Sequence, residues 1–191
     1  MASLEMNFDT LIARMKQGRN FDDSNFEPVY YLVYRPEEVL QAKRLLPLLL
    51  TKLNHEKWKP EVLSMSAVIG ELLMNAKPRK IWLIGDRKAP LEWNKANESL
   101  ANYLAQGRLQ KVIEDKLAAM QGRKGNPVLV ITDLEALHPY MRIGAIESEL
   151  YGKFKVPTVF LYPGIRAGAT KLKFLGFYPE DGNYRSVHIG G

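Results

Sequence analysis

The 191-residue sequence contains no cysteine, and this absence excludes several classes of protein and site. Disulfide bonds, thiolate metal sites and a cysteine nucleophile are all ruled out. No stretch approaches the roughly 20 consecutive apolar residues that a membrane-spanning helix needs. The start of the chain, MASLEMNFDT, carries acidic side chains and no long apolar run, unlike a secretory signal. We therefore expect a cytoplasmic protein that makes no membrane contact.

The residues that are present describe a folded globular protein with a moderate excess of positive charge. Hydrophobic residues make up 46% of the chain and charged residues 25%, which argues against extended disorder. The formal net charge of +6 would attract nucleic acid or an acidic protein surface. Basic and acidic residues are mixed along most of the chain, so we favour a protein partner over a nucleic-acid surface. The one dense basic patch before the C-terminal region comprises Lys77, Arg79, Lys80, Arg87 and Lys88.

Alternating strand and helix signals predict an α/β fold with a mainly parallel central sheet flanked by helices. The predicted core strands are the short apolar runs at residues 29–34 and 127–133, and the short segment at residues 60–65 fits a further strand. After the first run, a proline followed by two glutamates predicts a helix from about residue 35 to residue 54. We expect a single domain over residues 1–191, with an amphipathic N-terminal helix over residues 4–18.

The middle of the chain gives one clear prediction and one open question. Leucine, isoleucine and valine at spacings of three to five residues predict a helical stretch over residues 96–120, closed by Gly122. Residues 77–98 leave alternatives open, because the run at residues 81–84 fits either a short strand or a helix-to-loop segment. Trp93 fits either a surface anchor or a core position.

The last quarter of the chain carries the strongest turn chemistry. Residues 157–162 form a short apolar run that Pro163 and Gly164 stop, which predicts a buried strand that opens into a loop. Two further apolar stretches, at residues 171–177 and 184–189, flank a turn sequence. We expect these two stretches to form a C-terminal antiparallel hairpin.

One segment partly matches a nucleotide-hydrolysing site. Residues 128–133 are an apolar strand ending in Asp133, the position at which such enzymes hold magnesium. That chemistry also needs a glycine-rich loop with lysine and then serine or threonine opening a helix. Residues 164–171 have the wrong spacing and lead into a strand. We therefore predict that Asp133 caps a helix or anchors a loop.

The glycine-rich loop predicted after Tyr162 leaves an alternative open. Ligands of α/β proteins bind beyond the carboxyl ends of the strands, and backbone amides beside basic side chains suit an anion. The candidate anion-binding residues are Asp133, Gly164, Arg166, Gly168 and Lys171. The simpler interpretation, which we prefer, is a flexible loop whose glycines permit positive φ.

Catalytic and metal sites find no support in the sequence. His55, His138 and His188 are isolated, and only His138 follows a carboxylate, Asp133, closely. No serine or further carboxylate stands at a spacing that identifies a mechanism, and no metal-ligand spacing occurs. We expect no catalytic residue, no metal and no cofactor.

Motifs along nearly the full length resemble a known family. They are the Phe8-x-x-Leu11 helix, YRPEE at residues 34–38, VLVITD at 128–133, VPTVFLYPG at 156–164, Leu172, Phe174 and DGNYR at 181–185. Together they are similar to the BrxB proteins of bacterial BREX phage-defence systems. The resemblance is specific in the final third and loose between about residues 77 and 98.

The resemblance implies a small non-enzymatic component that works beside larger factors. These are a DNA methyltransferase, an ATPase and a PglZ-like protein of the alkaline-phosphatase superfamily, the last as the direct partner. Interface energy concentrates in aromatic and arginine anchors. We therefore predict partner-binding roles for Trp58, Trp82, Trp93, Arg166 and Arg185. The alternatives are a basic DNA-binding domain and a vestigial nucleotide-binding or anion-binding domain.

Overall fold

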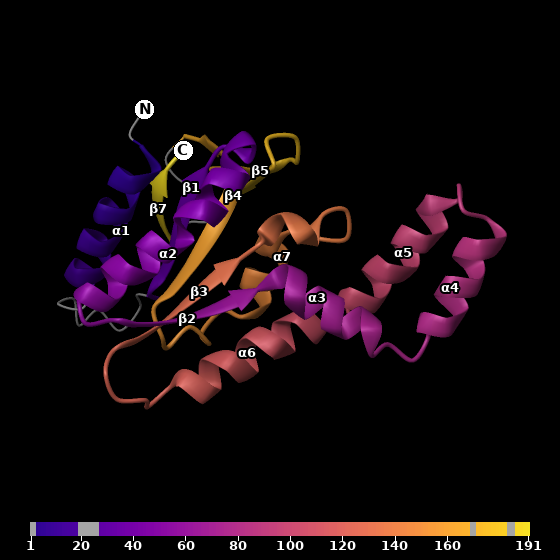
Figure 1. Ribbon diagram of the computed structural model, residues 1–191, viewed down its shortest axis with the longest axis horizontal. Helices are drawn as coiled ribbons and strands as arrows, with labels where there is room; N and C mark the ends of the chain where they lie inside the picture. The colour runs from indigo at the N-terminus through magenta and orange to yellow at the C-terminus, as the bar shows by residue number, and fades with distance from the viewer. Residues whose placement is uncertain (1–2, 19–26, 169–170, 183–185) are drawn as a thin grey trace.

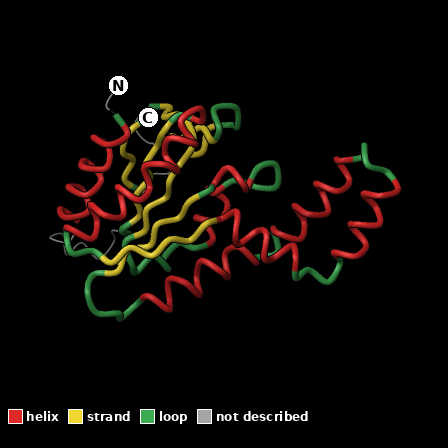
Figure 2. Tube along the Cα trace, in the orientation of Figure 1, coloured by secondary structure: helices red, strands yellow, loops and turns green. Residues whose placement is uncertain are grey.

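In the computed structural model of the protein, the described residues are 3–18, 27–168, 171–182 and 186–191. They form a seven-stranded sheet with helices on both faces (Figures 1 and 2). Five strands lie in the order β2, β3, β4, β1, β7, and each neighbouring pair is parallel. Their bounds are β1 (Val29–Tyr34), β2 (Lys59–Ser64), β3 (Pro127–Thr132), β4 (Thr158–Ala167) and β7 (Val187–Gly190). The predicted α/β class and mainly parallel sheet are confirmed.

Two hydrophobic layers cover the sheet, one on each face. All six residues of β1 are buried, and alternate side chains point to opposite faces of the sheet. Tyr31 belongs to the layer on the first face and Tyr30 to the layer on the second face. Helices α1 (Leu4–Gly18) and α2 (Val39–His55) cover the second face, and a short 3₁₀ helix, η1 (Pro36–Glu38), precedes α2. The first face is covered by α3 (Met65–Met74), α6 (Arg108–Met120), η2 (Leu134–Leu137) and α7 (Ile143–Glu149). The predicted helices at residues 4–18 and 35–54 are therefore confirmed.

The helical stretch predicted over residues 96–120 is two helices. α5 (Trp93–Leu104) ends before Gly107, which adopts a left-handed conformation with φ of 73°, and α6 begins at Arg108. Residues 79–88, in the region left open by the sequence, form α4. Among the described residues, no helix is both long and apolar enough to cross a membrane.

The C-terminal strands differ from the prediction in two ways. Pro163 and Gly164 do not end β4, which continues to Ala167 and pairs antiparallel with β5 (Lys171–Phe174). A Cβ on Gly164 would lie 2.6 Å from the carbonyl oxygen of Lys173, so glycine here permits the close approach of β5.

The partner of β5 in the C-terminal hairpin also differs from the predicted stretch at residues 184–189. β6 (Glu180–Gly182) pairs with β5, whereas β7 lies beside β1 in parallel. Ile189 of β7 is 4% exposed and belongs to the layer beneath α1. Burial of this side chain in the main core explains why β7 joins the central sheet.

Candidate interaction surface

Helices α4 and α5 form a hairpin that projects from the sheet body (Figure 1). We call this element, residues 79–104, the α4–α5 hairpin. Twelve large hydrophobic side chains among the described residues are exposed, and six of them belong to the hairpin or to the residues just before it. These are Met74, Ile81, Leu83, Ile84, Leu91 and Trp93, with exposed fractions between 41% and 85%. Such a concentration of exposed apolar side chains on one element is typical of an interaction site.

The hairpin has little core of its own. α4 has no buried residue, and α5 buries only Leu104, at the end nearest the body. The two helices are joined by Trp82, whose indole N–H donates to Ser99 Oγ at 2.8 Å and whose ring meets Tyr103 edge-on at 5.3 Å. The guanidinium of Arg108 lies 3.9 Å from the centre of the Tyr103 ring. Aromatic and cation–π contacts therefore hold the hairpin together and connect it to α6.

A groove of about 470 Å³ lies along the hairpin. Leu73, Ile81, Trp82 and Leu100 contribute apolar walls. The groove is also lined by charged residues of both signs: Arg79, Asp86, Lys88, Glu92 and Lys95. Residues 77–98 carry six basic and three acidic side chains, so their net charge of +3 is half of the +6 of the whole chain. The charged lining of the groove itself is mixed, with three basic and two acidic side chains.

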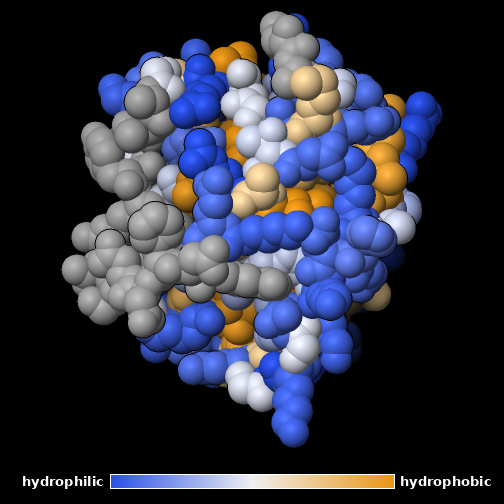
Figure 3. Space-filling model, turned by 90° about the vertical axis from the view of Figure 1, so that its left-hand side faces the viewer, coloured by the Kyte–Doolittle hydropathy of each residue, from blue (hydrophilic) through white to orange (hydrophobic). Residues whose placement is uncertain are grey.

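The opposite end of the molecule has a different character. Hydrophilic residues cover most of the coloured surface of that end, and hydrophobic residues show only in small patches (Figure 3). Leu40 of α2 is an example of a single exposed apolar residue, at 66%. Single residues of this kind are normal on a protein surface.

The predicted partner-binding residues lie in different environments. Trp82 and Trp93 come together on the α4–α5 hairpin, Trp82 half-buried and Trp93 65% exposed. Trp58 is 3% exposed and packs in the core layer beneath α1 and α2, so its ring is not at the surface. Arg166 lies on the exposed part of β4, and Arg185 lies outside the described residues. We retain the two hairpin tryptophans as candidates.

Asp133 anchors the end of β3. Its carboxylate accepts hydrogen bonds from Ser64 Oγ at 2.5 Å and Thr132 Oγ1 at 3.0 Å. Lys43 Nζ lies 2.8 Å from Asp133 and 2.6 Å from Glu135. Burial by itself would raise the pKa of Asp133, but the hydrogen bonds from Lys43, Ser64 and Thr132 outweigh it and hold the pKa below its ordinary value. The carboxylate thereby ties β3 to β2 and α2.

The other candidate anion-binding residues belong to the β4–β5 hairpin. Gly164 and Arg166 are paired strand residues, opposite Phe174 and Leu172. Gly168 has a φ of 78°, which agrees with the positive φ expected for this glycine. Lys171 Nζ lies 3.2 Å from a Glu180 carboxylate oxygen. No hydrogen bond or ion pair described for these residues joins them to Asp133.

The histidines do not form a catalytic arrangement in the part of the chain that the structure describes. His138 Nδ1 lies 2.7 Å from the Tyr178 hydroxyl, and its ring meets Phe177 and Tyr178 edge-on. The described residues also include no group of three or more histidine, aspartate or glutamate side chains placed to hold a metal ion.

The sequence analysis did not single out the aliphatic residues of the α4–α5 hairpin. Ile81, Ile84 and Leu91 are exposed, but in the sequence they resemble ordinary core positions. The sequence could have indicated them, because the residues of the dense basic patch lie close to these apolar residues in the chain. Apolar and basic residues mixed in one short segment are typical of a surface that binds a partner.

Part of the chain matches the model of a known protein family. Residues 69–189 match a family model described as BREX protein BrxB. The matched range includes the whole α4–α5 hairpin and strands β3 to β6. No curated protein and no solved structure shows significant similarity to the chain.

Proposed function

The chain belongs to the BrxB family of BREX phage-defence proteins, and from this membership we propose that it is a non-enzymatic assembly component that binds a larger BREX protein through the α4–α5 hairpin. The observation that carries the proposal is the cluster of six exposed hydrophobic side chains at residues 74–93. Binding of a partner over these side chains would be favourable, because it removes their apolar surface from water.

The proposed partner is the PglZ-like protein of the same system, in the cytoplasm. We propose that it presents an amphipathic helix whose apolar face enters the groove beside Trp82. Acidic residues flanking that face would pair with Arg79 and Lys88 at the groove. This arrangement uses the two exposed properties of the hairpin, its apolar side chains and its positive charge.

The test compares two equally exposed hydrophobic residues. Trp93→Glu introduces a charge on the hairpin, and Leu40→Glu introduces the same charge on α2, where exposure is 66% against 65% for Trp93. Loss of a tryptophan anchor costs about 2 kcal/mol or more, which corresponds to roughly a 30-fold weaker complex. We expect Trp93→Glu to weaken binding to the purified PglZ-like protein by at least about tenfold and Leu40→Glu to leave it unchanged, by isothermal titration calorimetry.

Three results would contradict the proposal. The first is that the unaltered protein does not bind the PglZ-like protein. The second is that Trp93→Glu binds as tightly as the unaltered protein, and the third is that both variants lose affinity equally. Binding to a different BREX component with the same dependence on Trp93 would keep the hairpin as the interface and replace the partner.

Direct DNA binding is a second candidate, favoured by the net charge of +3 on residues 77–98. Such binding weakens steeply as salt rises, because contacts to phosphates release counterions. Arg87→Gln with Lys88→Gln would then reduce DNA affinity and the salt dependence together. Absence of any gel shift with single-stranded or duplex DNA at low salt would exclude this candidate.

A further inference from the structure

Basic residues that are scattered in the sequence come together at one edge of the central sheet. Residues 56–59, 121–126 and 152–157 stand at the starts of β2, β3 and β4, which are parallel neighbours, so these segments lie at the same edge. They carry six basic side chains and one acidic side chain, a net charge of +5. Figure 1 shows this edge at the end of the molecule away from the α4–α5 hairpin. We call these three segments the basic edge.

Hydrogen bonds hold the three segments side by side. The backbone N–H of Lys59 donates to the Asn126 carbonyl at 2.9 Å, and Lys59 Nζ donates to the Lys124 carbonyl at 3.4 Å. The backbone N–H of Leu129, just inside β3, donates to the Pro157 carbonyl at 2.9 Å. Neighbouring strands lie about 4.8 Å apart, so the starts of three strands span about 10 Å. The basic side chains therefore form one short row.

A repeated pattern positions the lysines at two of the three strands. Residues 57–59 read KWK and residues 153–155 read KFK, and in both the lysines are exposed while the aromatic residue between them is buried. Trp58 is 3% exposed in the core layer beneath α1 and α2, and Phe154 is 2% exposed in the layer on the other face. Each buried ring anchors the backbone between two lysines, so both lysines are held at the surface.

Most of the positive charge of the basic edge is not balanced within the protein. Four of its six basic residues are exposed and form no ion pair with the acidic side chains that the structure describes: Lys57, Lys59, Lys124 and Lys155. Arg123 and Lys153 are each paired with a glutamate. The one acidic residue of the edge, Glu56, is itself paired with Lys16 at 2.5 Å. The four lysines are therefore available to an anionic partner.

The basic edge offers charge without apolar surface. None of the exposed large hydrophobic side chains among the described residues lies within its three segments. Protein interfaces concentrate their energy in aromatic and arginine anchors and are depleted of lysine. Nucleic-acid phosphates, in contrast, are bound by positive charge alone. Single-stranded nucleic acid is bound by stacking its bases on exposed rings, and Trp58 and Phe154 are buried, which favours a duplex.

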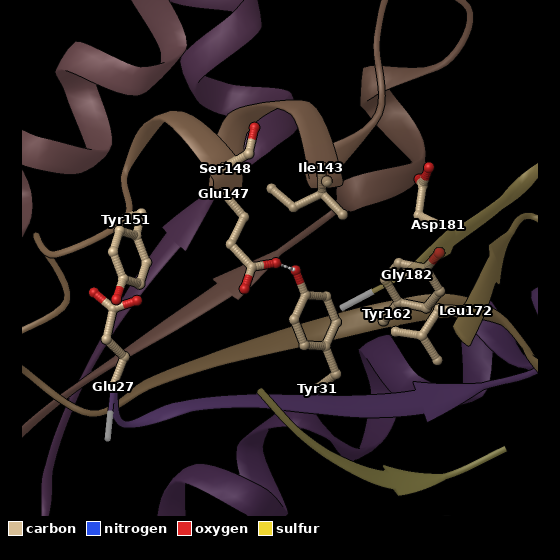
Figure 4. A pocket seen from close by; sticks show the side chains of 11 residues that line it. Glu27, Tyr31, Ile143, Glu147, Ser148, Tyr151, Tyr162, Leu172, Asp181 and Gly182 are labelled. Atoms are coloured by element: carbon tan, nitrogen blue, oxygen red, sulfur yellow. Dashed lines mark hydrogen bonds between the residues drawn. The ribbon is translucent and has the colours of Figure 1, made fainter. Parts of the chain in front are cut away.

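An acidic cavity limits the basic edge on the far side of β4. Glu27, which precedes β1, accepts a hydrogen bond from the backbone N–H of Gly152 at 2.5 Å. With Glu147 and Asp181 it lines a cavity of about 430 Å³, and no lysine, arginine or histidine is among the described lining residues (Figure 4). Carboxylates repel phosphates, so a nucleic acid would contact the starts of β2, β3 and β4 and avoid the cavity.

We propose that the basic edge binds the phosphate backbone of duplex DNA without sequence preference. A DNA duplex carries one negative charge per about 1.7 Å of its axis, so a row of about 10 Å faces several phosphates. Lysines that contact phosphates read no base edges, so the contact does not depend on sequence. This surface is separate from residues 77–98, which carry the other concentration of positive charge.

The experiment measures binding of a fluorescein-labelled duplex of about 20 base pairs to the full chain by fluorescence anisotropy. Four lysine–phosphate contacts predict a slope of about −3.6 for the logarithm of the binding constant against the logarithm of salt concentration. Binding should therefore weaken roughly 100-fold between about 50 and about 200 mM salt. The single strand of the same length and vesicles containing phosphatidylserine are the comparison ligands, and we expect both to bind more weakly than the duplex.

Two triple variants with the same change in net charge locate the contact. The edge variant combines Lys57→Gln, Lys124→Gln and Lys155→Gln. The control variant combines three other substitutions at lysines for which the described residues also provide no ion pair: Lys77→Gln, Lys80→Gln and Lys173→Gln. Lys59 is left unchanged, because its Nζ holds the segment before β3.

We expect the edge variant to bind the duplex at least about tenfold more weakly at about 50 mM salt, with a slope that is smaller by about 2.7. The control variant should lose less than about twofold, since its lysines lie away from the basic edge. Because the hairpin is a separate surface, Trp93→Glu should leave duplex binding unchanged. Failure of the DNA contact is thus distinguished from failure of the proposed hairpin interface.

Four results would overturn the proposal. The first is that the duplex does not bind at about 50 mM salt. The second is that the single strand or the vesicles bind more tightly than the duplex. The third is that the two triple variants lose affinity equally, and the fourth is that only Arg87→Gln with Lys88→Gln weakens binding, which would place the DNA on the hairpin.

Discussion

His188 shows how one side chain responds to the fold around it. It lies on β7, with its ring edge-on to Tyr31 at 5.6 Å and its Nε2 3.1 Å from Ser186 Oγ. The pKa of His188 is lowered from 6.5 to about 4, mainly by burial and to a smaller extent by the charge of Arg166. The ring is therefore neutral in the folded protein at neutral pH.

We predict that His188 lowers the stability of the folded protein in mild acid. Between pH 6.5 and about 4 the unfolded chain binds a proton at this site and the folded protein does not, so stability falls as the pH decreases. Because the ring is only half-buried, we expect a loss of about 1–2 kcal/mol from this group. His188→Gln should remove that part of the pH dependence in urea unfolding.

His55 is the control, because its side chain is exposed. His55→Gln makes the same change at this exposed position and is compared with His188→Gln in the same urea unfolding experiment. If both variants show the same dependence on pH as the unaltered protein, burial of His188 does not weaken folding in acid.

At the scale of elements, the break between α5 and α6 depends on Gly107. A Cβ at this position would meet nothing within 4 Å, so space does not require glycine. The requirement is the φ of 73°, which L-residues other than glycine adopt only at a cost. Without this break, the helical pattern on both sides would continue as one helix.

We predict opposite effects for the same substitution at two glycines. Gly107→Ala should destabilise the protein by about 1 kcal/mol, because alanine is strained in the left-handed conformation. Gly70→Ala, inside α3 and also without neighbours within 4 Å, should stabilise by up to about 1 kcal/mol, since alanine favours the helix. Both changes are measured by chemical denaturation, and equal effects at the two sites would contradict the backbone explanation.

The sequence predicted most elements but not this break. Apolar residues continue across it at helical spacing, from Leu100 and Leu104 to Leu109 and Val112. A glycine inside such a pattern is compatible with an uninterrupted helix. The conformation of Gly107 depends on where α5 and α6 bury their apolar faces. The sequence around Gly107 does not contain this information.

At the scale of the whole molecule, the sheet body and the α4–α5 hairpin are built differently. The body buries both faces of its central strands, whereas the hairpin exposes most of its apolar residues. We propose that the body folds without the hairpin. Replacing residues 79–102 by a short glycine-serine linker should keep a cooperative transition, because Tyr103 and Leu104, which contact the core layer, remain.

Tryptophan fluorescence provides the measurement. The replacement removes Trp82 and Trp93 and leaves Trp58, which is 3% exposed in the body, as the sole tryptophan. We expect blue-shifted emission that moves to the red in one cooperative urea transition, together with loss of binding to the PglZ-like protein. Emission typical of exposed tryptophan without denaturant would show that the hairpin is part of the folding unit.

The sequence by itself determined the α/β class, the N-terminal helix and the two buried strands β1 and β3. These follow from local patterns, since an all-apolar run such as residues 29–34 must be buried on both faces and an amphipathic helix must cover a surface. Only the tertiary structure decided that β7 lies beside β1, that β4 continues through Gly164, and that Trp58 is inside while Trp93 is outside. The physical reason is that apolar composition sets whether a side chain favours burial, whereas contacts between residues far apart in the chain decide which surface buries it.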